Sequence, residues 1–189
     1  MLKLKLIVTS TRPGRKGLAI AEAFLPIIKS NPAFETELVD LAELKLPVFD
    51  EPNHPRLKQY TKEHTKKWSA IIDDADAFIF VLPEYNYSAP GSVKNAMDFL
   101  SQEWAAKPLG FISYGGVSGG LRAVDSMLQA LRAFKIVSIP EGVHISMFAK
   151  YINDDGKFET DEHMEKAAQG MLHELARWAE ALKGMREKK

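Results

Sequence analysis

Residues 77–86 read AFIFVLPEYN, which is a run of six apolar residues followed by a turn with one proline and one aromatic side chain. A short apolar run bounded by turn residues predicts a strand that is buried on both faces, as in a parallel sheet. Ligands of open parallel α/β sheets bind beyond the carboxyl ends of the strands. Because the turn Pro83–Asn86 offers fixed backbone groups and little titratable chemistry, it suits a flat, planar cofactor better than an acid–base site.

Strand-like and helix-like segments alternate along the rest of the chain, which predicts βαβ units and a parallel sheet. The expected strands are residues 4–10, 35–41, 77–82, 109–113 and 136–139, the last extended in some form through 143–145. The expected helices are residues 18–28, 57–75, 92–104 with Ser92 as its cap, 121–131, and a long C-terminal helix capped at Thr160 and closed by Lys183, Arg186, Lys188 and Lys189. Pro26 should kink or shorten the first helix. The proline-containing stretch 43–56 is expected to be an ordered loop.

This order of elements predicts one α/β domain that spans residues 1–189. A chain of this length is long enough for one sizeable core and short for two. The succession is typical of a flavodoxin-like, doubly wound fold, with a five-stranded parallel sheet of order 2-1-3-4-5 and helices on both faces.

The composition excludes several classes of function. Lysine and arginine number 25, as do aspartate and glutamate, so the charge gives no sign of a nucleic-acid, membrane or strongly charged partner. Because the chain has no cysteine, disulfides, thiolate catalysis and cysteine-ligated metals are ruled out. The five histidines lack metal-ligand spacing, and we expect no metal site. No apolar run approaches ~20 residues and no signal peptide is recognised, so we expect a cytoplasmic protein.

The first strand-to-helix loop, residues 9–17, reads TSTRPGRKG and suits a terminal phosphate. The backbone N–H groups and the dipole of the following helix favour an anion at that position. Arg12 can add charge-assisted hydrogen bonds, and Ser10 and Thr11 can add hydroxyls. The alternative is a solvated basic turn. A Walker A motif cannot be fitted to these residues, which argues against a P-loop nucleotidase.

A second glycine-rich stretch, Gly115–Gly120, follows the fourth expected strand. It does not match the dinucleotide fingerprint, because Val117 occupies the position of the second glycine. Two interpretations remain open: a tight turn into the next helix, or a backbone that approaches a ligand closely.

Taken together, the three loops resemble the NADPH-dependent FMN reductase family, the flavodoxin-like group that includes quinone, azo-dye and chromate reductases. The resemblance covers about residues 4–144, most of the chain. It is carried by the Ser10–Arg15 loop, by Pro83–Asn86 with the downstream Pro90–Asp98, and by the glycines of the third loop. Three loops that match in order and spacing are far more specific than any one of them.

The resemblance implies an FMN site at these loops, with hydride transfer at flavin N5 and no catalytic side chain. The residues implied at the phosphate are Ser10, Arg12 and the backbone of Lys16, Gly17 and Leu18. Those implied at the isoalloxazine are Pro83, Glu84, Tyr85 and Asn86, largely through backbone groups, with Tyr114, Gly115 and Gly116 near the pyrimidine side or the ribityl chain. Two departures are Thr9, where the family commonly has glycine, and Gly17, where many members have serine.

The implied function is an FMN-dependent NAD(P)H oxidoreductase. Hydride from NADPH or NADH passes to FMN and then, in a ping-pong scheme, to a quinone or a similar small-molecule acceptor such as an azo dye, free flavin or chromate. A flavodoxin-type electron carrier is the alternative, although such carriers are strongly acidic and have hydroxyl-rich phosphate loops without an arginine such as Arg12. A regulatory or structural α/β domain without flavin is a third hypothesis. The resemblance also implies a homodimer or homotetramer, in which residues 43–56 cover a neighbouring subunit's flavin.

Overall fold

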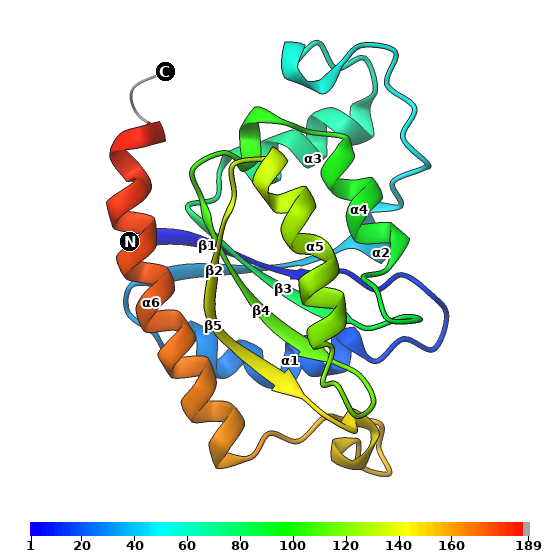
Figure 1. The fold of residues 1–189 in the computed structure, drawn as a ribbon, viewed down its shortest axis with the longest axis vertical. Coiled ribbons are helices and arrows are strands. Elements are labelled where there is room, and N and C mark those ends of the chain that lie inside the picture. The colour runs from blue at the N-terminus through cyan, green and yellow to red at the C-terminus, as the bar shows by residue number, and fades with distance from the viewer. Residues whose placement is uncertain (187–189) are drawn as a thin grey trace.

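The computed structural model describes residues 1–186 as a five-stranded parallel sheet with helices on both faces (Figure 1). The strands are β1 (Leu2–Val8), β2 (Phe34–Asp40), β3 (Ala77–Pro83), β4 (Pro108–Tyr114) and β5 (Val137–Ile145). The helices are α1 (Gly17–Lys29), α2 (Leu41–Leu44), α3 (Glu63–Asp73), α4 (Gly91–Asp98), α5 (Leu121–Ala133) and α6 (Glu162–Arg186), with 3₁₀ turns at Pro55–Leu57, Gln102–Trp104 and Phe148–Tyr151. The strand order is β2-β1-β3-β4-β5, so the predicted fold class and order are confirmed.

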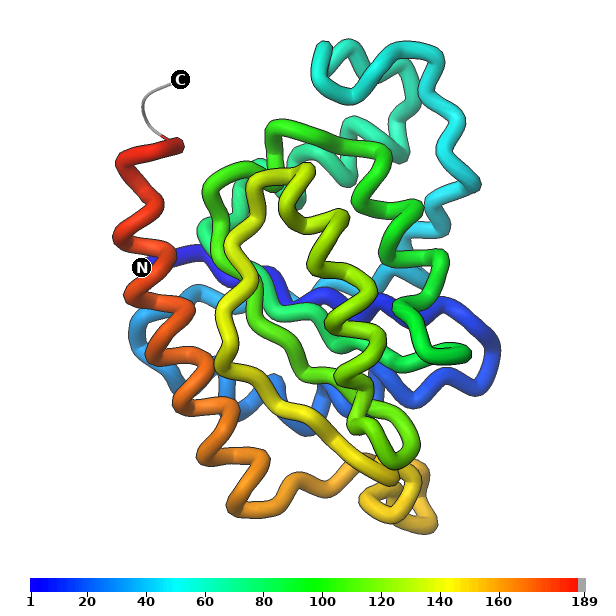
Figure 2. Tube along the Cα trace, in the orientation of Figure 1, coloured from blue at the N-terminus to red at the C-terminus, as the bar shows by residue number. Residues whose placement is uncertain are grey.

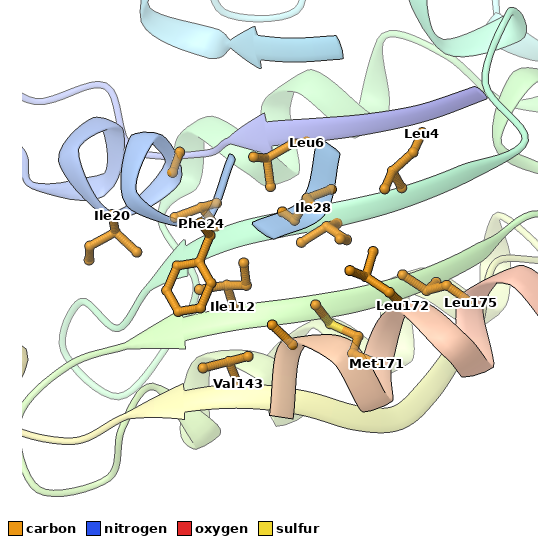
Figure 3. Packing of buried hydrophobic residues seen from close by; sticks show 14 of the residues in the cluster. Leu4, Leu6, Ile20, Phe24, Ile28, Ile112, Val143, Met171, Leu172 and Leu175 are labelled. Atoms are coloured by element: carbon orange, nitrogen blue, oxygen red, sulfur yellow. The ribbon is translucent and has the colours of Figure 1, made fainter. Parts of the chain in front are cut away.

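The apolar run in β3 is buried on both faces because each face of the sheet has its own hydrophobic core. Ile79 and Val81 belong to the core beneath α1 and α6, whereas Phe78 and Phe80 belong to the core beneath α3, α4 and α5. On the α1 and α6 side, helix and sheet side chains interdigitate around Phe24 (Figure 3). This arrangement explains why β3 is continuously apolar rather than alternating.

The predicted helix 57–75 is shorter than expected, since α3 begins at Glu63. Lys58 has a left-handed backbone, and Lys62, the residue before the helix, is extended. The side chain of Glu51 accepts hydrogen bonds from the backbone N–H groups of Thr61 and Lys62, both at 2.9 Å. These contacts end the loop and start the helix. The stretch between α2 and α3 leaves the sheet and returns, as the trace in Figure 2 shows.

Other sequence expectations about the helices also need correction. Ser92 does not cap α4, because Pro90 is the N-cap and the Ser92 hydroxyl donates to the carbonyl oxygen of Thr9 (2.6 Å). Asp161, rather than Thr160, accepts a hydrogen bond from a backbone N–H in the first turn of α6. Pro26 does not interrupt α1, which runs to Lys29. The predicted helix 92–104 ends at Asp98 with a separate 3₁₀ turn after it, the short helix α2 was not expected, and Lys188 and Lys189 lie outside the described residues.

The loops that follow β1, β3 and β4 emerge from the carboxyl edge of three adjacent strands in the middle of the sheet. Parallel sheets bind ligands at this edge. Among residues 1–186, no helix combines the length and the apolar character that a membrane span requires.

Candidate functional site

The structure brings the three loops singled out in the sequence into direct contact. Glu84 donates its backbone N–H to the carbonyl oxygen of Tyr114 (3.0 Å), which joins the second loop to the third. The Arg12 Nε donates to the Tyr85 hydroxyl (3.3 Å), which joins the first loop to the second. The Tyr114 hydroxyl lies 3.4 Å from Ser10 Oγ, which joins the third loop to the first. These contacts link the three loops to one another at the carboxyl edge of the sheet.

The first loop presents a helix N-terminus and an arginine, Arg12, that forms no ion pair among residues 1–186. No side chain in that part of the chain caps α1, and the first N–H groups of a helix have no partner within it. Arg15 is occupied, because its guanidinium binds both carboxylate oxygens of Asp40 at 3.2 and 2.6 Å. Arg12 is exposed, and its side-chain contacts within the described residues are with Tyr85 alone. Arg12 is therefore the guanidinium that can reach an anion at this helix end, with Lys16 exposed beside it.

Gly17, one of the two departures from the resemblance, lies in a tightly packed position. A Cβ atom at Gly17 would lie 2.5 Å from Ser10 Oγ and 2.8 Å from the Tyr114 hydroxyl oxygen. Both Ser10 and Tyr114 are buried, and burial raises the pKa of the Tyr114 hydroxyl to about 12. The Tyr114 side chain thus packs against Ser10 and Gly17 of the first loop. The space that a serine side chain would need at position 17 is filled.

Thr9, the other departure, is also a structural residue. Its hydroxyl donates to the carbonyl oxygen of Val81 at 2.8 Å, and its own carbonyl oxygen accepts the Ser92 hydroxyl. The Thr9 side chain therefore links the end of β1 to β3, and we assign it no role in ligand binding.

The second loop is a tight turn with an unusual backbone. Tyr85 and Ser88 exchange two backbone hydrogen bonds of 2.9 and 3.0 Å, and the residues between them, Asn86 and Tyr87, have φ values of 50° and 67°. Residues other than glycine rarely adopt such angles, and they do so mainly where the surroundings fix them, often at functional sites. The turn holds the Tyr85 ring beside Arg12, whose guanidinium carbon lies 5.6 Å from the ring centroid.

Glu84 fixes the second loop to the third loop with its side chain. Its carboxylate accepts hydrogen bonds from the Ser118 hydroxyl (2.6 Å) and from both the backbone N–H (3.2 Å) and the guanidinium (3.1 Å) of Arg122. The Ser118 hydrogen bond, aided by Arg122, lowers the Glu84 pKa. A carboxylate held in its ionised form positions neighbours and is a poor proton donor. Arg122 also lies 4.2 Å from the centroid of the Tyr87 ring.

The third loop contains glycines of two kinds. Gly119 and Gly120 have φ values of 63° and 84°, and a Cβ at Gly120 would lie 2.7 Å from the Tyr114 nitrogen. These two glycines form the tight turn into α5. At Gly116, by contrast, a Cβ would meet no atom within 4 Å. Gly116 is exposed, its carbonyl oxygen accepts the backbone N–H of Met147 (2.8 Å), and Gly115 packs closely against Gly120.

Comparison with known proteins identifies the family. Residues 2–150 match the family described as NADPH-dependent FMN reductase. This chain belongs to the NADPH-dependent FMN reductase family. The family prediction is confirmed, and with it the prediction that the protein is an NAD(P)H-dependent oxidoreductase.

Relatives of this FMN reductase family member include an NAD(P)H-dependent FMN reductase from Nectria sp, 42% identical over 69% of this chain and 68% of that protein. Alignments with two yeast FMN reductases cover 60 and 62% of those proteins. An NAD(P)H:quinone oxidoreductase from Solanum tuberosum is 29% identical over 97% of this chain and 96% of its own. Among solved structures, FerB, a flavoenzyme NAD(P)H:(acceptor) oxidoreductase from Paracoccus denitrificans, has a TM-score of 0.73 at 25% identity and covers 96% of this chain and 98% of its own.

Sequence reasoning about this reductase missed the residues that hold the loops together. Ser118, Arg122 and Tyr87 were not singled out, yet they surround the Glu84 carboxylate and the turn beside it. Arg122 lies 38 positions after Glu84 in the chain. The available signal in the sequence was Glu84 itself, because a single acidic residue in an otherwise uncharged turn indicates a polar or charged partner.

Proposed function

We propose that this reductase holds FMN across the three loops and uses it to carry electrons from NAD(P)H to a quinone or a similar acceptor. The observation that carries the proposal is the joining of the loops. These loops carry three features: a helix N-terminus without a side-chain cap next to Arg12, a turn that presents Tyr85, and the exposed Gly116. These are the features that a phosphate, a planar ring and its polar edge each require.

The residues present fit the phosphate end of FMN. The first-turn N–H groups of Gly17 and Leu18 supply donors, and the helix dipole favours a negative charge. The Arg12 guanidinium adds a cation that no carboxylate among residues 1–186 neutralises, whereas Asp40 neutralises Arg15. Ser10 stays a proposed phosphate ligand, and its hydroxyl is fully buried beside Tyr114.

The ring end of the proposed site depends on backbone more than on side chains. Pro83, Glu84, Tyr85 and Asn86 would line the ring, and the bonds of the Glu84 carboxylate would keep the second and third loops at a fixed separation. When bound, FMN supplies two-electron redox chemistry that no amino-acid side chain provides. The protein itself would then hold the reactants in the right relative orientation. Orientation alone contributes much of the rate in such reactions.

Reconstitution tests this proposal. Purified protein titrated with FMN should quench the flavin fluorescence and retain the flavin absorption bands after gel filtration. The loaded protein should then oxidise NADPH or NADH when a quinone is supplied. A protein that neither retains FMN nor oxidises either nucleotide would contradict the proposal. Retention of FMN with no oxidation unless a partner reductase is added would instead favour the flavodoxin-type carrier.

Tyr85 offers a sharper test of the ring site. Tyr85→Ala should weaken FMN retention, because it removes the aromatic ring that the turn presents. Tyr85→Phe is the matched control, since it deletes the hydroxyl bonded to Arg12 and keeps the ring. Unchanged FMN affinity in Tyr85→Ala would remove this residue from the site.

Two further parts of the proposal concern the state of the protein in the cell. The assembly would be a homodimer or homotetramer in which residues 43–56 approach the neighbouring subunit's flavin. The proposed compartment is the cytoplasm. The absence of cysteine fits that compartment.

A further inference from the structure

A cavity of about 570 Å³ lies beside the first loop, and no part of the proposed ring site lines it. It is bounded by Thr11 of that loop, by α2 with the segment that follows it, and by the first turns of α4. The turn Pro83–Asn86 and the glycines 115 and 116 do not line it. The cavity therefore adjoins the phosphate end of the site and is separate from the surface that would carry the reacting ring.

The walls of this cavity combine an apolar side with a single cation. Leu41, Leu46 and Val48 supply the apolar side. Lys45 is the one charged residue in the lining, and its side chain is exposed and has no ion pair or hydrogen bond among residues 1–186. Its backbone is left-handed, with a φ of 50°, a conformation that costs free energy for a residue other than glycine.

Hydrogen bonds tie the segment after α2 to helix α4 beside the cavity. Asn95 of α4 accepts the backbone N–H of Phe49 (3.0 Å) and donates to the carbonyl oxygen of Pro47 (2.7 Å). Asp40, at the start of α2, is neutralised by Arg15, and Glu43 on the same helix does not line the cavity. Lys45 thus faces a preformed recess in whose lining there is no carboxylate.

We propose that this cavity binds the adenosine half of NADPH, with the 2′-phosphate against Lys45. The inference rests on the proposed function, which requires a nicotinamide at the ring. A dinucleotide has a second half that must lie away from the ring, whereas a small quinone needs the ring surface alone. Leu41, Leu46 and Val48 suit the adenine, and an unpaired ammonium group suits a doubly charged phosphate. The cavity would therefore make the enzyme prefer NADPH to NADH.

Lys45→Gln tests this assignment, because glutamine removes the charge and keeps most of the side-chain length. The KM for NADPH should rise about tenfold, the loss expected for one charge-assisted hydrogen bond, while the KM for NADH stays within about twofold. Lys45→Arg should restore the preference for NADPH. Lys135→Gln is the matched control, since Lys135 is also exposed, has a φ of 57° and has no side-chain partner among the described residues, but does not line this cavity.

A binding measurement separates failure of this inference from failure of the proposed function. Adenosine 2′,5′-bisphosphate and adenosine 5′-monophosphate are titrated calorimetrically into the FMN-treated protein. The bisphosphate should bind more tightly, and Lys45→Gln should remove that difference even if the protein oxidises neither nucleotide. Equal affinity for the two probes, or an equal change of both KM values in Lys45→Gln, would overturn the assignment.

Discussion

Gly17 makes room for two buried hydroxyl groups beneath the proposed phosphate loop. Gly17→Ala would place a Cβ atom 2.5 Å from Ser10 Oγ and 2.8 Å from the Tyr114 hydroxyl oxygen. Overpacking of this kind costs about 1–3 kcal/mol of unfolding free energy. We expect that loss in urea denaturation at pH 7. Gly116→Ala, where the added Cβ meets no atom within 4 Å, is the control and should stay within about 0.5 kcal/mol of the parent.

A double-mutant cycle identifies the cause of the Gly17→Ala loss. The Ser10 hydroxyl can turn away by rotation about one bond, but the Tyr114 hydroxyl stands at the end of a rigid ring. In a Tyr114→Phe background, Gly17→Ala should therefore cost less than in the parent. The same cost in both backgrounds would show that the contact with Tyr114 is not responsible.

Arg12 and Arg15 stand three positions apart and have different roles. Arg15 is a structural residue bound to Asp40, so Arg12 is the candidate for the phosphate. Arg12→Gln should raise the Kd for FMN about tenfold to a hundredfold, as measured by fluorescence titration. Its Tm in the absence of flavin should change little, because Arg12 is exposed and contacts Tyr85 alone within the described residues.

Riboflavin, which lacks the phosphate, gives the internal control for Arg12→Gln. Its Kd should be the same in the parent and the variant if Arg12 acts through the phosphate. Arg132→Gln removes an exposed arginine near the end of α5 and should leave both affinities unchanged. An equal loss for FMN and riboflavin would place Arg12 at the ring instead.

At the scale of the elements, helix α3 is held at both ends by buried charged side chains from outside the helix, Glu51 of the preceding loop and Lys107 just before β4. Glu51 accepts the N–H groups before its first turn. At the other end, Lys107 Nζ donates to the carbonyl oxygens of Ile72 (2.6 Å) and Asp73 (3.0 Å), and burial lowers the Lys107 pKa to about 8. Charges of these signs at these ends also complement the helix dipole. The position of α3 is thus set from outside the helix.

Glu51 should make the stability of the protein depend on acid pH. Burial by itself raises the pKa of the Glu51 carboxyl, but the hydrogen bonds from Thr61 and Lys62 outweigh it, and the pKa falls from 4.5 to about 2. A group whose pKa is lower in the folded state stabilises it above the unfolded pKa and loses that contribution as the pH falls toward the folded one. Glu51→Gln should therefore cost roughly 2–3 kcal/mol at pH 7.

Urea denaturation of the parent and of Glu51→Gln between pH 7 and pH 2 checks this. The difference between the two should be constant down to about pH 5 and should shrink as the pH falls further toward 2. A difference that does not change with pH would mean that Glu51 acts through packing alone.

The ends of α3 also show where sequence reasoning fails. The apolar face of residues 57–75 predicted a helix, but the start of that helix depends on Glu51, a residue in the preceding loop. Strand β3 was easier to predict than helix α3, because burial on both faces leaves a local pattern of consecutive apolar residues. Local sequence patterns predict helices and strands, whereas the ends of these elements depend on contacts with residues outside them, which form only when the chain folds.

At the scale of the whole molecule, the same division applies to the site. The strand order and the three loops could be predicted, because alternating elements and local motifs carry that information. The contacts between loops could not be predicted, since Tyr114 and Ser10 are 104 positions apart and meet only when the sheet is assembled. The sequence therefore predicted where the proposed site lies, but not the contacts that hold its loops together.

The proposed oligomer would have to cover exposed apolar side chains of the single chain. Val48, in the segment after α2, is 86% exposed, and Val117 in the third loop is 85% exposed. A second copy that covers these side chains would remove their apolar surface from water. We therefore expect light scattering to give at least a dimer at micromolar concentration. A monomer under those conditions would contradict the proposal.

Val48→Glu tests whether the segment 43–56 takes part in that contact. A carboxylate buried in an apolar interface without a partner is costly, so the variant should shift toward monomer and should also lose FMN affinity if the segment covers a neighbour's flavin. Met185→Glu introduces the same charge at a residue of α6 that is 64% exposed, and it should change neither mass nor flavin binding. A stable dimer of Val48→Glu with the parent's affinity for FMN would show that the subunits meet elsewhere.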